Sequence, residues 1–140
     1  MDSEEALVRR LEWYFRVLGY VIAKEVPVGV RSVDLYCVDA DTGTTVAVEA
    51  KLRDWRGALR QARVYKLAAD FIYIALPECA ITEGCLDACS EEGIGAISMP
   101  KRGRARLVLA AVPHGRQRRA LVHKALSAVG PKLGAASLYA

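Results

Sequence analysis

The chain has 140 residues, of which 53% are apolar and 26% are charged, and its net charge is +4. This length fits one compact domain over residues 1–140, and the composition excludes wholesale disorder. No apolar run approaches about 18 residues, so we expect no membrane span. The acidic start lacks the basic and apolar segments of a secretory signal, so we expect the protein in the cytoplasm.

Positive charge is concentrated in the C-terminal third of the sequence. Residues 1–92 contain 11 Lys and Arg and all 16 Asp and Glu, whereas residues 93–140 contain 9 Lys and Arg and no acidic residue. A segment with only positive charges indicates a polyanionic partner. A basic face that is simply solvated is the alternative interpretation.

Hydrophobic periodicity and turn residues predict the secondary structure. We expect Asp2 to cap the first helix and Gly19 to end it. In chain order we expect a helix over 2–18, strands over 20–26, 33–38 and 44–51, a helix over 55–69, a strand over 71–76, a helix over 82–92, strands over 94–99 and 106–112, and a helix over 116–129. The segment over 28–32 is expected to be a loop. This order predicts an α/β domain with a mixed central sheet flanked by helices.

The strands over 33–38 and 44–51 are expected to form an antiparallel hairpin, because turn-forming residues lie between them. With a four-residue loop over 40–43, Asp34 lies directly across from Glu49. A five-residue loop would place Val48 there and send Glu49 to the opposite face, because a slip of one residue turns every side chain over. We therefore predict that the carboxylates of Asp34 and Glu49 converge.

The tripeptide Glu49-Ala50-Lys51 indicates the chemistry. Residues i and i+2 of a strand share a face, so Glu49 and Lys51 stand side by side. Two carboxylates suit Mg²⁺, which takes one or two of them plus substrate phosphate oxygens. Mg²⁺, or Mn²⁺ in its place, held by Asp34, Glu49 and the Ala50 carbonyl, would activate a water, and Lys51 would contact the water or the phosphate. A solvated ion pair and a non-cleaving site are the alternatives.

The order of helix, hairpin with Asp and Glu-x-Lys, helix with Gln and buried strand resembles that of the PD-(D/E)xK nuclease superfamily over about residues 5–100. This restriction-endonuclease-like group has an αβββαβ core and includes archaeal Holliday junction resolvases and Mrr-like and RecB-like nuclease domains. The resemblance implies that Asp34 and Glu49 hold the metal and that Lys51 is catalytic. Val33 stands where the family has proline.

Two helical residues extend the resemblance. A Q-A-x-x-Y pattern found in some branches matches the segment from Gln61 to Tyr65. It implies that Gln61 hydrogen-bonds Lys51 or a substrate phosphate; a satisfied polar residue at the edge of the core is the alternative. Some branches use a glutamate of the first helix as an extra metal ligand, and Glu12 occupies that place, although a solvated position is equally compatible. We expect Tyr65 in the core with its hydroxyl satisfied.

Basic residues in three clusters are candidates for phosphate contacts. Positions 56, 60 and 63 follow i, i+4, i+7 spacing and predict a stripe beside the site, while other cations surround Gly103 or begin the last helix, whose N-terminus attracts phosphate. The candidates are Arg53, Arg56, Arg60, Arg63, Lys101, Arg102, Arg104, Arg116, Arg118 and Arg119. No base-reading pattern is present, so we expect recognition of the DNA backbone or shape.

These observations favour a Mg²⁺-dependent DNA endonuclease. A homodimer is expected, because one unit of this size offers a single site and a duplex has two strands to cut. Structure-selective cleavage, as in Holliday junction resolvases, is a narrower hypothesis. A catalytically degenerate DNA-binding module of the same fold and an RNA-directed nuclease are the alternatives.

The four cysteines form no C-x-x-C pair, which argues against a zinc ribbon. Cys85 and Cys89 are spaced to share one face of a helix. We expect a buried structural role for them, with an iron–sulfur cluster or a disulfide as alternatives.

Overall fold

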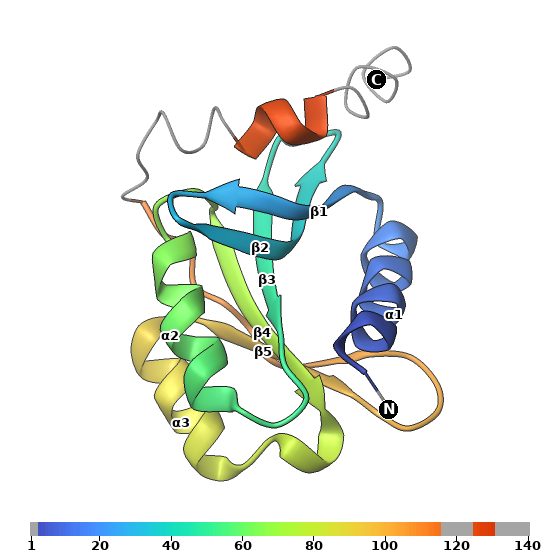
Figure 1. Cartoon of the computed structure of the whole chain (residues 1–140), viewed down its shortest axis with the longest axis vertical. Helices are drawn as coiled ribbons and strands as arrows, with labels where there is room; N and C mark the ends of the chain where they lie inside the picture. The colour runs from blue at the N-terminus through green and yellow to red at the C-terminus, as the bar shows by residue number, and fades with distance from the viewer. Residues whose placement is uncertain (1–2, 116–124, 131–140) are drawn as a thin grey trace.

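A six-stranded mixed sheet forms the centre of the molecule, and its strands lie side by side in the order of the sequence. The computed structural model describes residues 3–115 and 125–130 (Figure 1). The elements are α1 (Glu4–Val17), β1 (Tyr20–Val28), β2 (Arg31–Asp39), β3 (Thr45–Ala50), α2 (Trp55–Tyr65), β4 (Phe71–Pro77), the 3₁₀ helix η1 (Glu78–Ala80), α3 (Glu83–Glu92), β5 (Gly95–Met99) and β6 (Arg106–Leu109).

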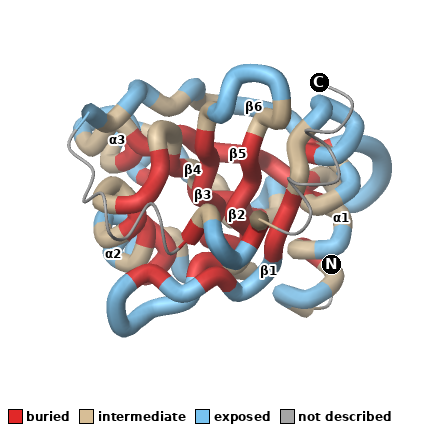
Figure 2. Tube along the Cα trace, turned by 90° about the horizontal axis from the view of Figure 1, so that it is seen from above, coloured by how far each residue is buried: buried red, intermediate tan, exposed pale blue. Residues whose placement is uncertain are grey.

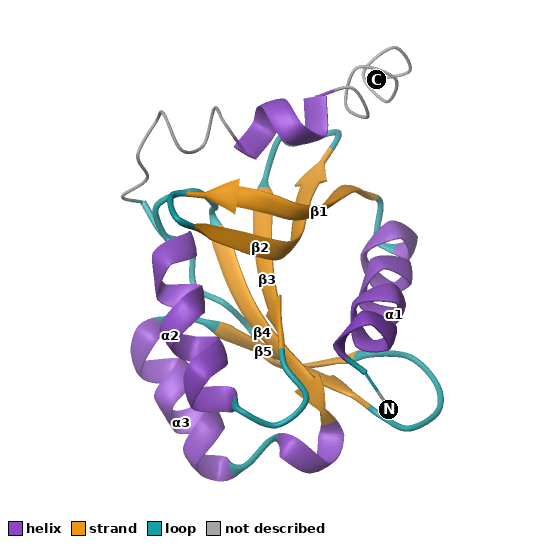
Figure 3. Cartoon of the chain, viewed as in Figure 1, coloured by secondary structure: helices purple, strands orange, loops and turns teal. Residues whose placement is uncertain are grey.

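Strand direction divides the sheet into an antiparallel and a parallel part. The strands β1, β2 and β3 are antiparallel neighbours, β3, β4 and β5 run parallel, and β6 returns antiparallel to β5. The helices α2 and α3 cover one face and α1 the other (Figures 1 and 3). Central strands covered on both faces need apolar residues throughout, and β3 and β5 are buried along their whole length (Figure 2). The predicted α/β architecture is confirmed.

Each face of the sheet has its own hydrophobic core. The helix α1 contributes Leu7, Leu11 and Phe15 to one core. The core on the α2 side includes Tyr36 of β2. Val33 belongs to the same core as Tyr36 although it lies three residues before it, so the alternation of side chains along β2 is interrupted next to Asp34.

The hairpin of β2 and β3 has the predicted register. Leu35 pairs with Val48, and the other pairs of the ladder keep the same offset, so the loop covers the four residues 40–43. One step beyond the ladder, this offset brings Asp34 opposite Glu49. The turn closes this register, because the backbone N–H of Asp39 donates to the carbonyl oxygen of Thr44 at 2.9 Å and that of Gly43 donates to the carbonyl oxygen of Asp39 at 2.8 Å.

Element ends differ from the prediction at several places. Ser3 rather than Asp2 caps α1, because its Oγ accepts the N–H of Ala6 at 3.0 Å. The helix α2 ends at Tyr65 instead of residue 69, and β6 ends at Leu109 instead of residue 112. The predicted helix over 116–129 lies mostly outside the described residues, and 125–130 is helical. No helix in the described ranges combines the length and apolar character needed to cross a membrane.

The predicted loop over 28–32 is largely strand. Gly29 adopts a φ of 61°, which lets the chain reverse at residues 29 and 30 between β1 and β2. Pro27 is tolerated because β1 lies at the edge of the sheet. The prediction ends the strand before Pro27, because a proline normally ends a central strand. An edge strand can continue through a proline, as β1 does up to Val28, so the predicted loop is too long.

Candidate metal and nucleic-acid site

Asp34 and Glu49 meet at the open end of the β2–β3 hairpin. An Oδ2 atom of Asp34 accepts the backbone N–H of Ala50 at 2.8 Å. The two carboxyl groups lie close enough to share a hydrogen bond when one of them is protonated. Glu49 is only 3% exposed, an unusual burial for a glutamate. The predicted convergence of the two side chains is confirmed, and their role in binding metal stays a prediction.

Tyr65 of α2 fixes the orientation of the Glu49 carboxyl group. Its hydroxyl oxygen lies 2.6 Å from Oε1 of Glu49 and 3.0 Å from the carbonyl oxygen of Ser32. A tyrosine hydroxyl has one proton, so Tyr65 donates to Glu49 or to Ser32 at any one time. Helical periodicity predicts Tyr65 in the core but does not indicate that its partner is Glu49.

The environment favours the protonated form of both acids. Burial raises the pKa of Glu49 from 4.5 to about 7, and the negative charge of Asp34 adds to the rise, while the hydrogen bond from Tyr65 and the charge of Lys51 oppose it. Burial also raises the pKa of Asp34, against the hydrogen bond from the Ala50 N–H. Two buried carboxyl groups in contact repel each other when ionised, and a divalent cation between them would remove that repulsion.

Lys51 and Gln61, both predicted to be catalytic, form no hydrogen bond with each other in the described part of the chain. Lys51 follows β3 directly, and its backbone N–H donates to the carbonyl oxygen of Ala75 at 3.1 Å. Its positive charge acts on both carboxyl groups without a direct ion pair. Gln61 is half-buried one helical turn before Tyr65, and its side chain forms no hydrogen bond among residues 3–115 and 125–130. A contact of Gln61 with substrate stays a prediction.

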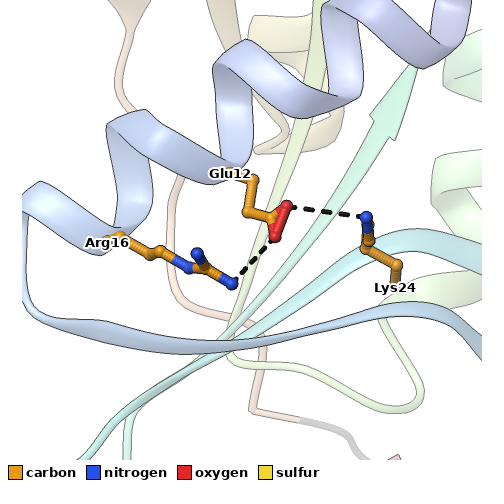
Figure 4. A network of polar contacts seen from close by, with 3 residues as sticks. All are labelled: Glu12, Arg16 and Lys24. Atoms are coloured by element: carbon orange, nitrogen blue, oxygen red, sulfur yellow. Dashed lines mark hydrogen bonds and ion pairs between the residues drawn. The ribbon is translucent and has the colours of Figure 1, made fainter.

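Glu12 is engaged elsewhere. Its Oε1 lies 2.9 Å from Nη2 of Arg16, and its Oε2 lies 3.6 Å from Nζ of Lys24 (Figure 4). Both carboxylate oxygens therefore have cationic partners. The residue of α1 whose charge acts on Asp34 is Glu4. The sequence places Glu12 at the edge of the apolar stripe of the first helix and does not predict which way its side chain points. In the structure the side chain points towards Lys24 of β1.

A hollow of about 530 Å³ gives access to Asp34 between the start of α1 and β1. Glu4, Glu5 and Glu25 line it together with Asp34. Glu25 has a φ of 53° and lies opposite Asp34 at a position where the β1–β2 ladder is interrupted. Side chains other than glycine rarely adopt this backbone conformation, and such residues concentrate near functional sites. No pattern in the sequence indicates this place for Glu25.

The donor set around Asp34 and Glu49 fits Mg²⁺. The ion prefers oxygen ligands and is commonly held by one or two carboxylates, with water and substrate phosphates completing its shell. Burial raises the pKa values of both carboxyl groups, so binding of a cation between them would release a proton. Within the described ranges, no cluster of three or more His, Cys, Asp or Glu is arranged to hold a metal alone. A metal here would therefore depend on water and substrate oxygens.

A cleft of about 1130 Å³ opens at the carboxyl ends of β3, β4 and β5, and its lining starts at Leu52, the residue that follows Lys51. Arg53 and Lys101 contribute cations to its lining, and Trp55 contributes an aromatic wall. Apolar residues and the acidic Glu78 are also part of the lining. In sheets with parallel strands, ligands commonly bind beyond these carboxyl ends.

The arginine stripe lies on the solvent side of α2. Arg56, Arg60 and Arg63 are exposed. Their helical positions lie on the side of α2 opposite Tyr65, so the stripe does not lie beside the carboxylate pair, and that part of the prediction is wrong. Arg56 stacks on Trp55 at 4.3 Å from the ring centroid. Arg63 is paired with Glu92 of α3, with Nε 3.0 Å from Oε2, and is less available for phosphate.

The other predicted contacts divide between a loop and the undescribed part of the chain. Lys101, Arg102 and Arg104 are exposed in the segment that joins β5 and β6. Arg116, Arg118 and Arg119 lie outside the described residues. All four cysteines are free, Cys37, Cys85 and Cys89 being buried and Cys79 exposed.

Comparison with protein-family models and with curated protein sequences finds no match. Among solved structures, the fold is similar to that of a chain in the EndoMS–dsDNA2 complex, with a TM-score of 0.50 and 19% identity over 72% of this chain. The match covers 45% of the other chain, so this protein corresponds to less than half of that neighbour. At this identity the likeness concerns the fold, and the superfamily assignment stays a prediction.

Proposed function

We propose that the protein is a Mg²⁺-dependent endonuclease that hydrolyses phosphodiester bonds of DNA, with Mn²⁺ able to replace Mg²⁺. The observation that supports this most is the contact between Asp34 and the buried Glu49 beside the charge of Lys51. The similarity of the fold to that of EndoMS in a complex with double-stranded DNA adds support. The cations of the adjacent cleft offer partners for phosphate groups.

Each residue of the site has a proposed role. Asp34, Glu49 and the carbonyl oxygen of Ala50 would hold the metal. When bound, Mg²⁺ would supply Lewis-acid polarisation of a phosphate oxygen and activation of a water. Tyr65 orients the Glu49 carboxyl group through their 2.6 Å contact. Lys51 would place its ammonium against phosphate oxygens as negative charge develops on them, an effect commonly equivalent to about 10²–10³ in rate.

A nicking assay on supercoiled DNA tests the proposal. With Mg²⁺ the wild type should cut, Asp34→Asn should be inactive, and Lys51→Ala should be slower by about 10²–10³. Asp41→Asn is the matched control, because Asp41 is exposed in the turn of the same hairpin. If the wild type binds DNA but does not cut it with Mg²⁺ or Mn²⁺, the proposed endonuclease activity is contradicted. The catalytically degenerate DNA-binding module is then favoured.

Substrate form and assembly are narrower parts of the proposal. Cleavage of duplex, single-stranded, flap and four-way DNA compared side by side tests structure selectivity of the Holliday-junction-resolvase type. Competition by structured RNA tests the RNA-directed alternative. The proposed homodimer predicts twice the monomer mass of 15.3 kDa in light scattering, with paired cuts on opposite strands.

A further inference from the structure

A short basic loop, residues 100–105, joins β5 to β6. Lys101, Arg102 and Arg104 are exposed on it, and it contains no acidic residue. Gly103, at its tip, has a φ of 94°, a conformation that other residues adopt only under strain. The loop thus has a defined turn, although it is short and strongly charged.

Arg10 of α1 clamps this basic loop. Its Nη1 donates to the carbonyl oxygen of Pro100 at 2.9 Å, and its Nη2 donates to the carbonyl oxygen of Gly103 at 2.7 Å. The two branches of one guanidinium therefore hold the first residue and the tip of the loop against α1, beside which the loop lies (Figure 3). Hydrogen bonds from a charged donor are stronger than neutral ones. In the described part of the chain, Arg10 has no carboxylate partner.

The clamped loop separates two hollows. Met99, at the base of the loop, lines both of them. On one side is the cleft of about 1130 Å³, where Lys101 and Arg53 are both part of the lining. On the other side is a groove of about 450 Å³ along α1, lined by Arg9, Arg10, Arg104 and the exposed Trp13. The loop is therefore a cationic ridge that forms one wall of the cleft.

This arrangement gathers positive charge at an electrostatic cost. Arg10 is placed against a loop that already contains three cations, and Arg9 lines the same groove. Like charges held together destabilise a fold, because their repulsion is relieved only by counter-ions or a polyanion. The backbone carbonyls need only a donor, which a neutral side chain would also supply. The choice of arginine and the charge of the loop together favour a ligand with several phosphates.

We propose that Arg10 is a positioning residue for nucleic-acid binding, which holds the basic loop so that Lys101 and Arg53 contact the DNA phosphate backbone from two walls of the cleft. This inference rests on the proposed function, because it assigns to this cleft the binding of the DNA strand that the enzyme would cut. Arg10 does not touch the DNA in this account. Its two hydrogen bonds fix the loop, and the loop makes the contact.

Equilibrium binding tests the inference separately from cleavage. The affinity for a fluorescently labelled DNA duplex is measured by anisotropy in EDTA, between roughly 50 and 200 mM salt, where each phosphate contact contributes about one unit to the slope of log K against log salt. The variants are Arg10→Lys, which keeps the charge but not the two-pronged clamp, and Lys101→Gln. Arg16→Lys, on the same helix but paired with Glu12, is the matched control.

Arg10→Lys and Lys101→Gln should each make the dependence of log K on log salt less steep by about one unit. Arg16→Lys should leave this slope unchanged. Lys101→Gln should have a smaller effect in the Arg10→Lys background than in the wild type, because the loop is no longer held. Gly103→Ala strains the turn without changing its charge and should have the same effect on the slope as Arg10→Lys. It replaces Arg10→Lys in the test if that variant does not fold.

Equal slopes for Arg10→Lys and Arg16→Lys, with Lys101→Gln equally effective in both backgrounds, would overturn the inference while leaving DNA binding intact. A wild type that binds no DNA at any salt concentration would remove both the inference and the proposed function. Wild-type binding that is insensitive to Lys101→Gln would show that the ridge does not face the DNA, and this result too would overturn the inference.

Discussion

The burial of Glu49 predicts that this residue destabilises the metal-free protein. Glu49→Gln replaces the carboxyl group by a neutral group of nearly the same shape. The amide oxygen can still accept the hydrogen bond from Tyr65, and the amide N–H can still donate to Asp34. The variant therefore resembles the wild type with Glu49 protonated.

The size of the effect follows from the pKa. A tenfold change in proton affinity corresponds to about 1.4 kcal/mol, so the rise of the Glu49 pKa from 4.5 to about 7 corresponds to about 3 kcal/mol. The folded protein binds this proton more tightly than the unfolded chain, so wild-type stability should fall as pH rises from about 4.5 to about 7 and then level off. Above that range Glu49→Gln should be the more stable protein by up to about 3 kcal/mol.

Urea unfolding in EDTA at a series of pH values measures this difference. The free energies of unfolding of wild type and Glu49→Gln should coincide near pH 4 and separate progressively up to neutral pH. Glu91→Gln, on the exposed side of α3, is the control and should stay within about 0.5 kcal/mol of the wild type. Excess Mg²⁺ should stabilise the wild type at neutral pH but not Glu49→Gln, because only the carboxylate holds the ion.

A difference between the two proteins that does not change with pH would refute the reasoning, because it would mean that Glu49 is not held in its protonated form by burial. A variant that is less stable than the wild type throughout would have the same consequence.

Three further substitutions give smaller or more selective effects. Tyr65→Phe removes the hydrogen bond that opposes the rise in the Glu49 pKa, so half-saturation with metal should move to higher pH, and urea unfolding should show a loss of about 1–3 kcal/mol. Glu12→Gln should leave metal affinity in calorimetry unchanged, whereas a tenfold loss would restore its predicted ligand role. Arg63→Gln should leave the salt slope of DNA binding unchanged, since Arg63 is engaged by Glu92.

The central pair was predictable because it depends on local rules. The four-residue loop determines the register of β2 and β3, and the offset of their ladder, continued by one step, brings Asp34 opposite Glu49. The order of helices and strands follows equally from periodicity, since long apolar runs such as β4 indicate buried strands.

The unpredicted features depend on contacts between distant segments. Arg10 meets the loop near Gly103 across 93 positions of the sequence, and no local pattern indicates that pairing. Helical periodicity placed Glu12 at the border of an apolar stripe, where a small rotation decides between β1 and the site. The conformation of Glu25 likewise follows from the sheet around it and not from its own residue type.

Calorimetric titration with Mg²⁺ and Mn²⁺, alone and with a DNA duplex present, tests the central claim most directly. The account predicts saturable metal uptake by the wild type, tighter at pH 8 than at pH 6 because the ion displaces the Glu49 proton, and no uptake by Asp34→Asn at this site. Absence of uptake by the wild type with DNA bound, or equal uptake by Asp34→Asn, would contradict it.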